Sequence, residues 1–320
     1  MAESKTQSAI EMERYLDPKV LAKITRLDLR ARHVVEGFIN GLHRSPFHGF
    51  SVEFATHREY VPGDDIKHID WKVQARTDRF YIKQYEEETN LQSTFLVDCS
   101  ESMHYGADSI SQGKKEGLTK YDYACATAAS LAFLLQQQQD AVGLALFDEE
   151  LLEYISPSGS PQQLKRMLHA MQQVTPRKAT KLAEVCHAVA EKASRRGLIC
   201  LVSDLFVDTD GVMQALERFR HYNHEVVVLH VLDEDELAFP FAQTTQFDGL
   251  EDMGKVTVTP RALREAYCEE IETFCHDVKR RCVAARIDYV RISTTDHLDA
   301  ALCGFLAARS AAVRKTSAKR

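Results

Sequence analysis

From residue 94 onward, short apolar runs alternate with longer segments in which apolar residues recur every three or four positions. The short runs predict strands and the longer segments predict helices, because a buried strand can be continuously apolar whereas a helix buries one face. We expect strands at residues 94–99, 141–147, 151–155, 198–203, 225–232 and 287–292. We expect helices near residues 120–139, 161–173, 181–195, 211–221, 260–284 and 296–309. This alternation predicts an α/β fold with a doubly wound, mostly parallel sheet.

One pair of predicted strands departs from the parallel pattern. Only Asp148, Glu149 and Glu150 join strand 141–147 to strand 151–155. A parallel crossover needs about a dozen residues or more. We therefore expect this pair to form an antiparallel hairpin at the edge of the sheet.

The first part of the chain has a different pattern. Residues 13–42 predict a helix, whereas residues 45–92 alternate apolar and polar side chains between turn residues and predict a small β-rich elaboration with a strand at 79–85. We divide the chain into an N-terminal helix with this elaboration (1–92), an α/β domain (93–310) and a basic, disordered tail (311–320).

Oxygen-bearing side chains occupy alternate positions at the end of the first α/β strand: Asp98, Ser100 and Ser102. Alternate side chains of extended backbone share a face, so these oxygens can converge just beyond the strand. Ligands bind at that edge of open α/β sheets. One carboxylate and two hydroxyls suit Mg²⁺ better than Zn²⁺. The competing interpretation is that these residues cap a helix and form turns.

Two later residues extend this pattern. The strand at 198–203 runs directly into Asp204, and Thr180 precedes a helical segment in a position where a loop would present its hydroxyl. With Asp98, Ser100 and Ser102, they match the ligand set of a metal-ion-dependent adhesion site. In residue types, spacing and chain order, the segment resembles a von Willebrand factor A domain. The resemblance implies that the sheet has an antiparallel edge strand and that Mg²⁺ or Mn²⁺ binds.

A second resemblance comes from motifs upstream of the strand at 94–99. They are Gly41–Gly49, Phe54–Arg58, Tyr60–Asp65, Ile69–Lys72, Ala75–Thr77 and Tyr85–Thr89. With the α/β segment, they resemble a bacterial family of uncharacterised proteins, domain of unknown function number fifty-eight, that accompanies MoxR-type AAA+ ATPases. The resemblance covers roughly residues 30–310. It implies a von Willebrand A-like fold, an Mg²⁺ site and an ATPase partner, but no established biochemical activity.

The single tryptophan, Trp71, lies among the charged residues Arg58, Asp64, Asp65 and Arg76 of these motifs. One interpretation is a buried tryptophan with satisfied ion pairs. The other is a docking surface for the partner, because tryptophan and arginine are enriched in interface hot spots. The sequence favours neither.

Composition narrows the possible functions. The net charge of −7 gives no reason to expect nucleic-acid binding, and no apolar run is long enough to span a membrane. The N-terminus lacks a signal-peptide core, so we expect a cytoplasmic protein. The eight cysteines lack zinc-site spacing. Cys268, Cys275 and Cys282 mark one helix face, and we expect them, with Cys99 and Cys200, to pack in the core.

The leading functional hypothesis is a Mg²⁺-dependent protein-binding module that acts as adaptor for a MoxR-type ATPase and handles an unknown protein client. A metal with an open coordination position can accept a carboxylate from a partner. The first alternative is a phosphatase-like hydrolase with Asp98 as nucleophile. Ser100 argues against it, because such phosphatases use a second Asp two residues on, and a hydroxyl is a poor acid. The second alternative is a structural interaction module with a vacant metal site. We expect no enzymatic activity.

Overall fold

The computed structural model describes residues 52–60, 70–77, 79–87, 91–106, 118–137, 139–176, 179–193, 195–248 and 254–296. The predicted helix at 13–42, the predicted helix at 296–309 beyond its first residue, and the predicted tail at 311–320 lie outside these residues. The chain divides into two compact units, with residues Ile39–Asn90 forming the smaller one. Each unit is described by itself.

The larger unit is built on a six-stranded sheet in the order β10-β7-β6-β3-β4-β5. Its strands are β3 (Gln92–Asp98), β4 (Ala141–Phe147), β5 (Leu151–Ser158), β6 (Leu198–Ser203), β7 (Glu225–Leu232) and β10 (Asp288–Ser293). Neighbouring strands are parallel except β4 and β5, which form an antiparallel pair at one edge. The predicted strands and the predicted edge hairpin are confirmed.

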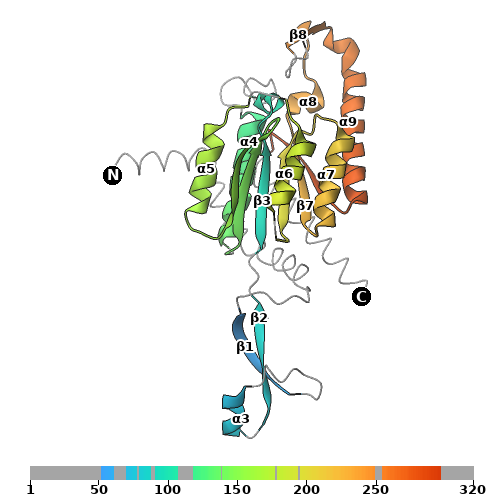
Figure 1. Cartoon of the computed structure of the whole chain (residues 1–320). Helices are drawn as coiled ribbons and strands as arrows, with labels where there is room; N and C mark the ends of the chain where they lie inside the picture. The colour runs from blue at the N-terminus through green and yellow to red at the C-terminus, as the bar shows by residue number, and fades with distance from the viewer. Residues whose placement is uncertain are drawn as a thin grey trace, which may run out of the picture. The chain divides into compact units, whose positions relative to one another are not determined.

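Helices cover both faces of this sheet (Figure 1). They are α4 (Lys120–Gln137), α5 (Gln163–Gln173), α6 (Leu182–Lys192), α7 (Thr209–His221) and α9 (Pro260–Ala284). Apolar residues of α6, α7 and α9 form one core cluster with alternate strand residues such as Leu96, Leu201 and Val228. Helices α4 and α5 contact strands β3 and β4 through a separate set of buried residues. Because both faces are covered, every residue of β4 and β6 is buried, and the two strands are apolar except for Ser203 at the end of β6.

The cysteine predictions agree with this core. Cys99, Cys200, Cys275 and Cys282 are buried, and Cys268 is partly buried. Burial raises the pKa of Cys282 to about 12. These thiols therefore behave as small apolar side chains in packing.

Three elements between β7 and α9 were not predicted. They are α8 (Glu234–Ala238) and an antiparallel pair, β8 (Thr245–Asp248) and β9 (Lys255–Val258). Each is only four or five residues long, too short to show a hydrophobic period. Helix α8 begins with a capping box, in which Asp233 and Glu236 exchange side-chain-to-backbone hydrogen bonds. Figure 1 shows β8 beyond α8.

In the smaller unit, β1 (Val52–Glu59) pairs antiparallel with β2 (Tyr81–Glu87), and a short helix, α3 (Trp71–Thr77), lies between them in the chain. The prediction of β structure here is confirmed, with the second strand two residues later than expected. The backbone N–H groups of Tyr60 and Asp70 bond to carbonyls of Phe80 and Tyr81. These bonds hold Tyr60 and Asp70 next to the start of β2.

Candidate functional site

The candidate site lies at the C-terminal edge of the central strands. Strand β3 is the point where the chain order reverses, since β4 lies on one side of it and β6 on the other. Asp98 ends β3, and Asp204 follows the last residue of β6. Because β3 and β6 are parallel neighbours, the fold brings these two carboxylates to the position where open α/β sheets bind ligands.

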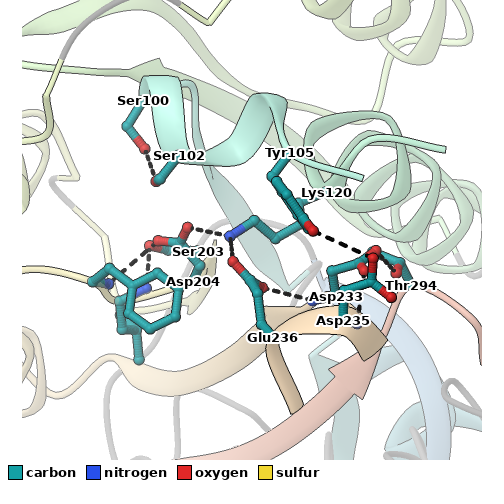
Figure 2. Close-up of polar contacts among 12 residues, drawn as sticks. Ser100, Ser102, Tyr105, Lys120, Ser203, Asp204, Asp233, Asp235, Glu236 and Thr294 are labelled. Carbon is teal, nitrogen blue, oxygen red and sulfur yellow. Dashed lines mark hydrogen bonds and ion pairs between the residues drawn. The ribbon is translucent and has the colours of Figure 1, made fainter. Parts of the chain in front are cut away.

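The first three predicted residues form a bonded group. The Asp98 carboxylate, fully buried, accepts hydrogen bonds from the Ser100 backbone N–H (2.9 Å) and the Ser203 hydroxyl (2.6 Å). The hydroxyl oxygens of Ser100 and Ser102 lie 3.0 Å apart (Figure 2). Ser100 occupies the N-cap position of the 3₁₀ helix η2 (Glu101–His104), but its side chain makes no capping bond. The helix-cap interpretation therefore does not account for the Ser100 hydroxyl.

Asp204 has a partner that the sequence did not indicate. The Lys120 ammonium lies 2.7 Å from Oδ2 of Asp204 and 2.6 Å from Oε1 of Glu236, between the two carboxylates (Figure 2). Lys120 is fully buried, and Asp204 nearly so. The other oxygen of Asp204 accepts the backbone N–H of Phe206 at 3.3 Å.

Thr180 lies in the loop before α6 and is half-buried. Its hydroxyl is 3.5 Å from the carbonyl oxygen of Asp148, which follows β4. Strand β4 is the neighbour of β3, so this contact brings Thr180 to the same edge of the sheet. The contacts of the described residues do not join Thr180 directly to the other four predicted ligands.

The electrostatics of the site are those of crowded negative charge. Burial and the nearby charge of Asp204 raise the pKa of Asp98 to about 7. Burial alone would raise the pKa of Asp204, but Lys120 and the Ser102 hydroxyl lower it below its ordinary value. Burial alone would lower the pKa of Lys120, but Asp204 and Glu236 raise it above its ordinary value. Lys120 is therefore a cation, and Asp204 its anion.

The donor set fits a hard divalent cation. Among the described residues, no three His, Cys, Asp or Glu side chains converge as metal ligands, so a metal here would depend on hydroxyls. Adjacent ligands of an octahedral Mg²⁺ ion, each about 2.1 Å from the metal, are about 3 Å apart. The Ser100 and Ser102 hydroxyls hydrogen-bond each other at 3.0 Å, so their oxygens already lie as close together as two adjacent ligands of such an ion. Asp98 and Asp204 would supply negative charge behind the hydroxyls, and Thr180 a further hydroxyl.

The smaller unit contains the other predicted surface. Trp71, the first residue of α3, is 60% exposed and contacts the ring of Phe80 edge-on at 6.4 Å between centroids. The interpretation of Trp71 as buried is therefore wrong. Arg76 is exposed in the last turn of α3. Asp64, Asp65 and the side chain of Arg58 lie outside the described residues.

Sequence reasoning missed four residues that bond to the site: Lys120, Ser203, His230 and Glu236. Ser203 had a signal, because it directly precedes Asp204. His230 had no such signal. It lies in β7, the strand next to β6, and its Nε2 is 2.8 Å from the Asp204 carbonyl oxygen. Lys120 and Glu236 are ordinary surface residue types, and no local pattern marked either as buried.

A mostly parallel sheet with one antiparallel edge strand and helices on both faces is an α/β domain, and this architecture agrees with the von Willebrand factor A-like fold that the sequence resemblance implies. The chain belongs to the family described as "Protein of unknown function DUF58", which matches residues 56–276. It is 27% identical over 248 residues to the uncharacterized protein Rv1480 of Mycobacterium tuberculosis, covering 75% of each chain.

Solved structures with a similar fold include the conserved hypothetical protein BatB from Bacteroides thetaiotaomicron. It is 15% identical with a TM-score of 0.46, and the match covers 69% of this chain and 99% of BatB. The SpRpn10 VWA domain is 12% identical with a TM-score of 0.39, covering 67% of this chain and 94% of that domain. Within the described part of this chain, no helix combines the length and apolarity needed to cross a bilayer.

Proposed function

We propose that this chain is a Mg²⁺-dependent protein-binding module, with Mn²⁺ as an alternative ion, that captures an acidic side chain of a protein partner. The observation that carries the proposal is the convergence of the hydrogen-bonded Ser100 and Ser102 hydroxyls with the buried carboxylates of Asp98 and Asp204 at one edge of the sheet. Mg²⁺ prefers six oxygen ligands and usually retains water. A site with few charged ligands leaves a water position that a partner carboxylate can take.

The identity of the partner rests on the family resemblance. It favours a role as adaptor for a MoxR-type AAA+ ATPase, with a client protein that the pair handles in the cytoplasm. The exposed Trp71 adds a surface in the smaller unit where a partner can bind independently of the metal.

The geometry weighs against the hydrolase alternative. A nucleophilic aspartate must reach a phosphorus atom, but Asp98 is fully buried and both of its oxygens already accept hydrogen bonds. One observation favours the metal-independent alternative: Lys120 already provides a cation for Asp204. An experiment must therefore separate metal binding from structural pairing.

Ser102→Ala is the most selective test, because it removes one hydroxyl and leaves both carboxylates in place. We expect calorimetry to show Mg²⁺ binding to the wild type and at least about tenfold weaker binding to the variant, since one of a few direct ligands is lost. Ser156→Ala, an exposed serine of β5, is the matched control and should bind like the wild type.

The partner is tested by co-purification with a MoxR-type ATPase, with and without EDTA. We expect EDTA and Ser102→Ala to weaken the complex alike. If the protein binds Mg²⁺ but the complex persists both in EDTA and with Ser102→Ala, the partner binds elsewhere, and the Trp71 surface becomes the candidate contact. Equal Mg²⁺ affinity in the wild type and Ser102→Ala would refute the assignment of the site.

A further inference from the structure

Lys120 occupies a position that physical chemistry disfavours twice. It is the first residue of α4, where the positive end of the helix dipole repels a cation. It is also fully buried, and burying a charge is costly unless it is paired. Buried ion pairs often add little to stability compared with apolar residues. A buried lysine at a helix start therefore calls for an explanation other than stability.

The contacts of Lys120 suggest that explanation. Its ammonium lies 2.7 Å from Oδ2 of Asp204. A divalent ion bound directly to that oxygen, at about 2.1 Å, would lie within about 5 Å of the ammonium, where the two cations repel each other. The remaining oxygen of Asp204 already accepts the Phe206 N–H.

We propose that Lys120 is a positioning residue that keeps Asp204 out of direct contact with the metal ion. The ion is then held by the serine hydroxyls, and Asp204 contributes through water or through the Ser102 hydroxyl. One coordination position stays free for the partner's carboxylate. This inference rests on the proposed function, because it concerns the same metal.

Glu236 is part of the same ion-pair cluster as Lys120 and Asp204. Its Oε1 shares the ammonium with Asp204, while its Oε2 accepts the backbone N–H of Asp233 at 2.7 Å. The ammonium therefore pairs with two buried or largely buried carboxylates, those of Asp204 and Glu236. Substitution of one of these groups alone would change the charge of the site as well as the pairing.

The test is a double substitution that separates Asp204 from the ammonium without changing the net charge of the site. Lys120→Met with Glu236→Gln removes one positive and one negative charge, so the net charge of the site is unchanged. The amide introduced by Glu236→Gln would still accept the Asp233 N–H, since glutamine also serves in capping boxes. Asp204 is then free of the ammonium. Binding of Mn²⁺ is followed by electron paramagnetic resonance of the free ion, with circular dichroism as the check on folding.

We expect the double variant to bind Mn²⁺ roughly tenfold or more tightly than the wild type, because Asp204 becomes a direct ligand. Adding Asp204→Asn should abolish that gain, whereas Asp204→Asn in the wild type should change the affinity only a few-fold. The inference alone is overturned if Asp204→Asn weakens Mn²⁺ binding by the same factor in both backgrounds. If neither background binds Mn²⁺, the proposed function falls and takes the inference with it. If only the double variant binds, the serine hydroxyls do not hold the ion in the natural protein, and both the proposed function and the inference are overturned.

A milder pair of variants keeps the question answerable should the double variant fail to fold. Glu236→Gln leaves Lys120 entirely to Asp204, whereas Glu234→Gln removes the same charge from the same helix without touching Lys120. We expect Glu236→Gln to weaken Mn²⁺ binding several-fold more than Glu234→Gln. Equal effects of the two substitutions would overturn the inference.

Discussion

Asp140 holds the start of the sheet together at an electrostatic cost that can be measured. Its Oδ1 accepts the backbone N–H of Leu91 at 3.0 Å, where the chain enters β3. Its other oxygen is buried and has no hydrogen-bond partner among the described residues, and Asp140 is 2% exposed. Burial raises the pKa of Asp140 from 3.8 to about 6. The perturbation we consider is Asp140→Asn, which keeps an acceptor for Leu91 and cannot ionise.

The direction of the effect follows from linkage. Between about pH 4 and pH 6 the native Asp140 retains its proton while the unfolded chain has released it, so the native state binds more protons and loses stability as the pH rises. The carboxyl thus favours folding most at low pH, and this advantage is lost above about pH 6. A difference of about two between the native and unfolded pKa values corresponds to roughly 2–3 kcal/mol. The amide of the Asp140→Asn variant has no such dependence.

We therefore expect the free energy of unfolding of Asp140→Asn, relative to the wild type, to improve by roughly 2–3 kcal/mol between about pH 4 and pH 7. Any constant cost of burying the amide cancels in this difference. Urea unfolding should be followed by far-ultraviolet circular dichroism, because the single tryptophan, Trp71, lies in the smaller unit. Glu153→Gln, an exposed residue of β5, is the control. A relative stability of Asp140→Asn that stays constant across this pH range would show that Asp140 is not a buried, proton-retaining carboxyl.

Two other outcomes follow from the buried groups. Lys120→Met alone should lower the free energy of unfolding by about 3–5 kcal/mol in urea, because it leaves Asp204 and Glu236 without their cation. Adding Glu236→Gln should recover part of this loss. A loss below about 1 kcal/mol would mean that the ion pairs are not desolvated. Burial raises the pKa of Cys186 and of Cys282 to about 12. These two thiols should therefore resist alkylation in the native protein, while the partly buried Cys268 reacts. Modification of all three thiols at one rate under native conditions would contradict the described core.

The sequence predicted the sheet well because its strands are buried on both faces. The run of β4 is apolar throughout and that of β6 is apolar up to Ser203, and no helical period competes with them. The edge hairpin was predictable from chain length alone, because three residues cannot make a parallel crossover. Elements of four or five residues were missed because they are too short to show a hydrophobic period; α8 begins with a capping box, and β8 and β9 pair with each other.

The candidate site was predictable only where its residues are adjacent in sequence or follow strands. Asp98, Ser100, Ser102 and Asp204 lie at strand ends, so topology alone brings them to one edge. Lys120 lies 84 residues from Asp204 in the chain, and Glu236 lies on a different helix, so their side chains meet only in the folded protein. Charge type gave no signal, since most lysines and glutamates are solvated.

Because Lys120 and Glu236 left no signal in the sequence, the Asp98, Ser100 and Ser102 motif alone does not predict the charges around the site. Asp98, Ser100 and Ser102 bring oxygen atoms together at one edge of the sheet, and on our proposal Lys120 at the start of α4 decides whether Asp204 is available to an ion. Two chains with the same motif can therefore hold a metal differently if one has a buried cation at that position and the other does not. For this chain the relevant comparison among relatives is the residue aligned with Lys120 together with the one aligned with Glu236. The proposal predicts that a relative with an uncharged residue at both positions, if it binds Mn²⁺, binds it directly through the aspartate, so that substitution of this aspartate by asparagine weakens binding more than Asp204→Asn does in this chain.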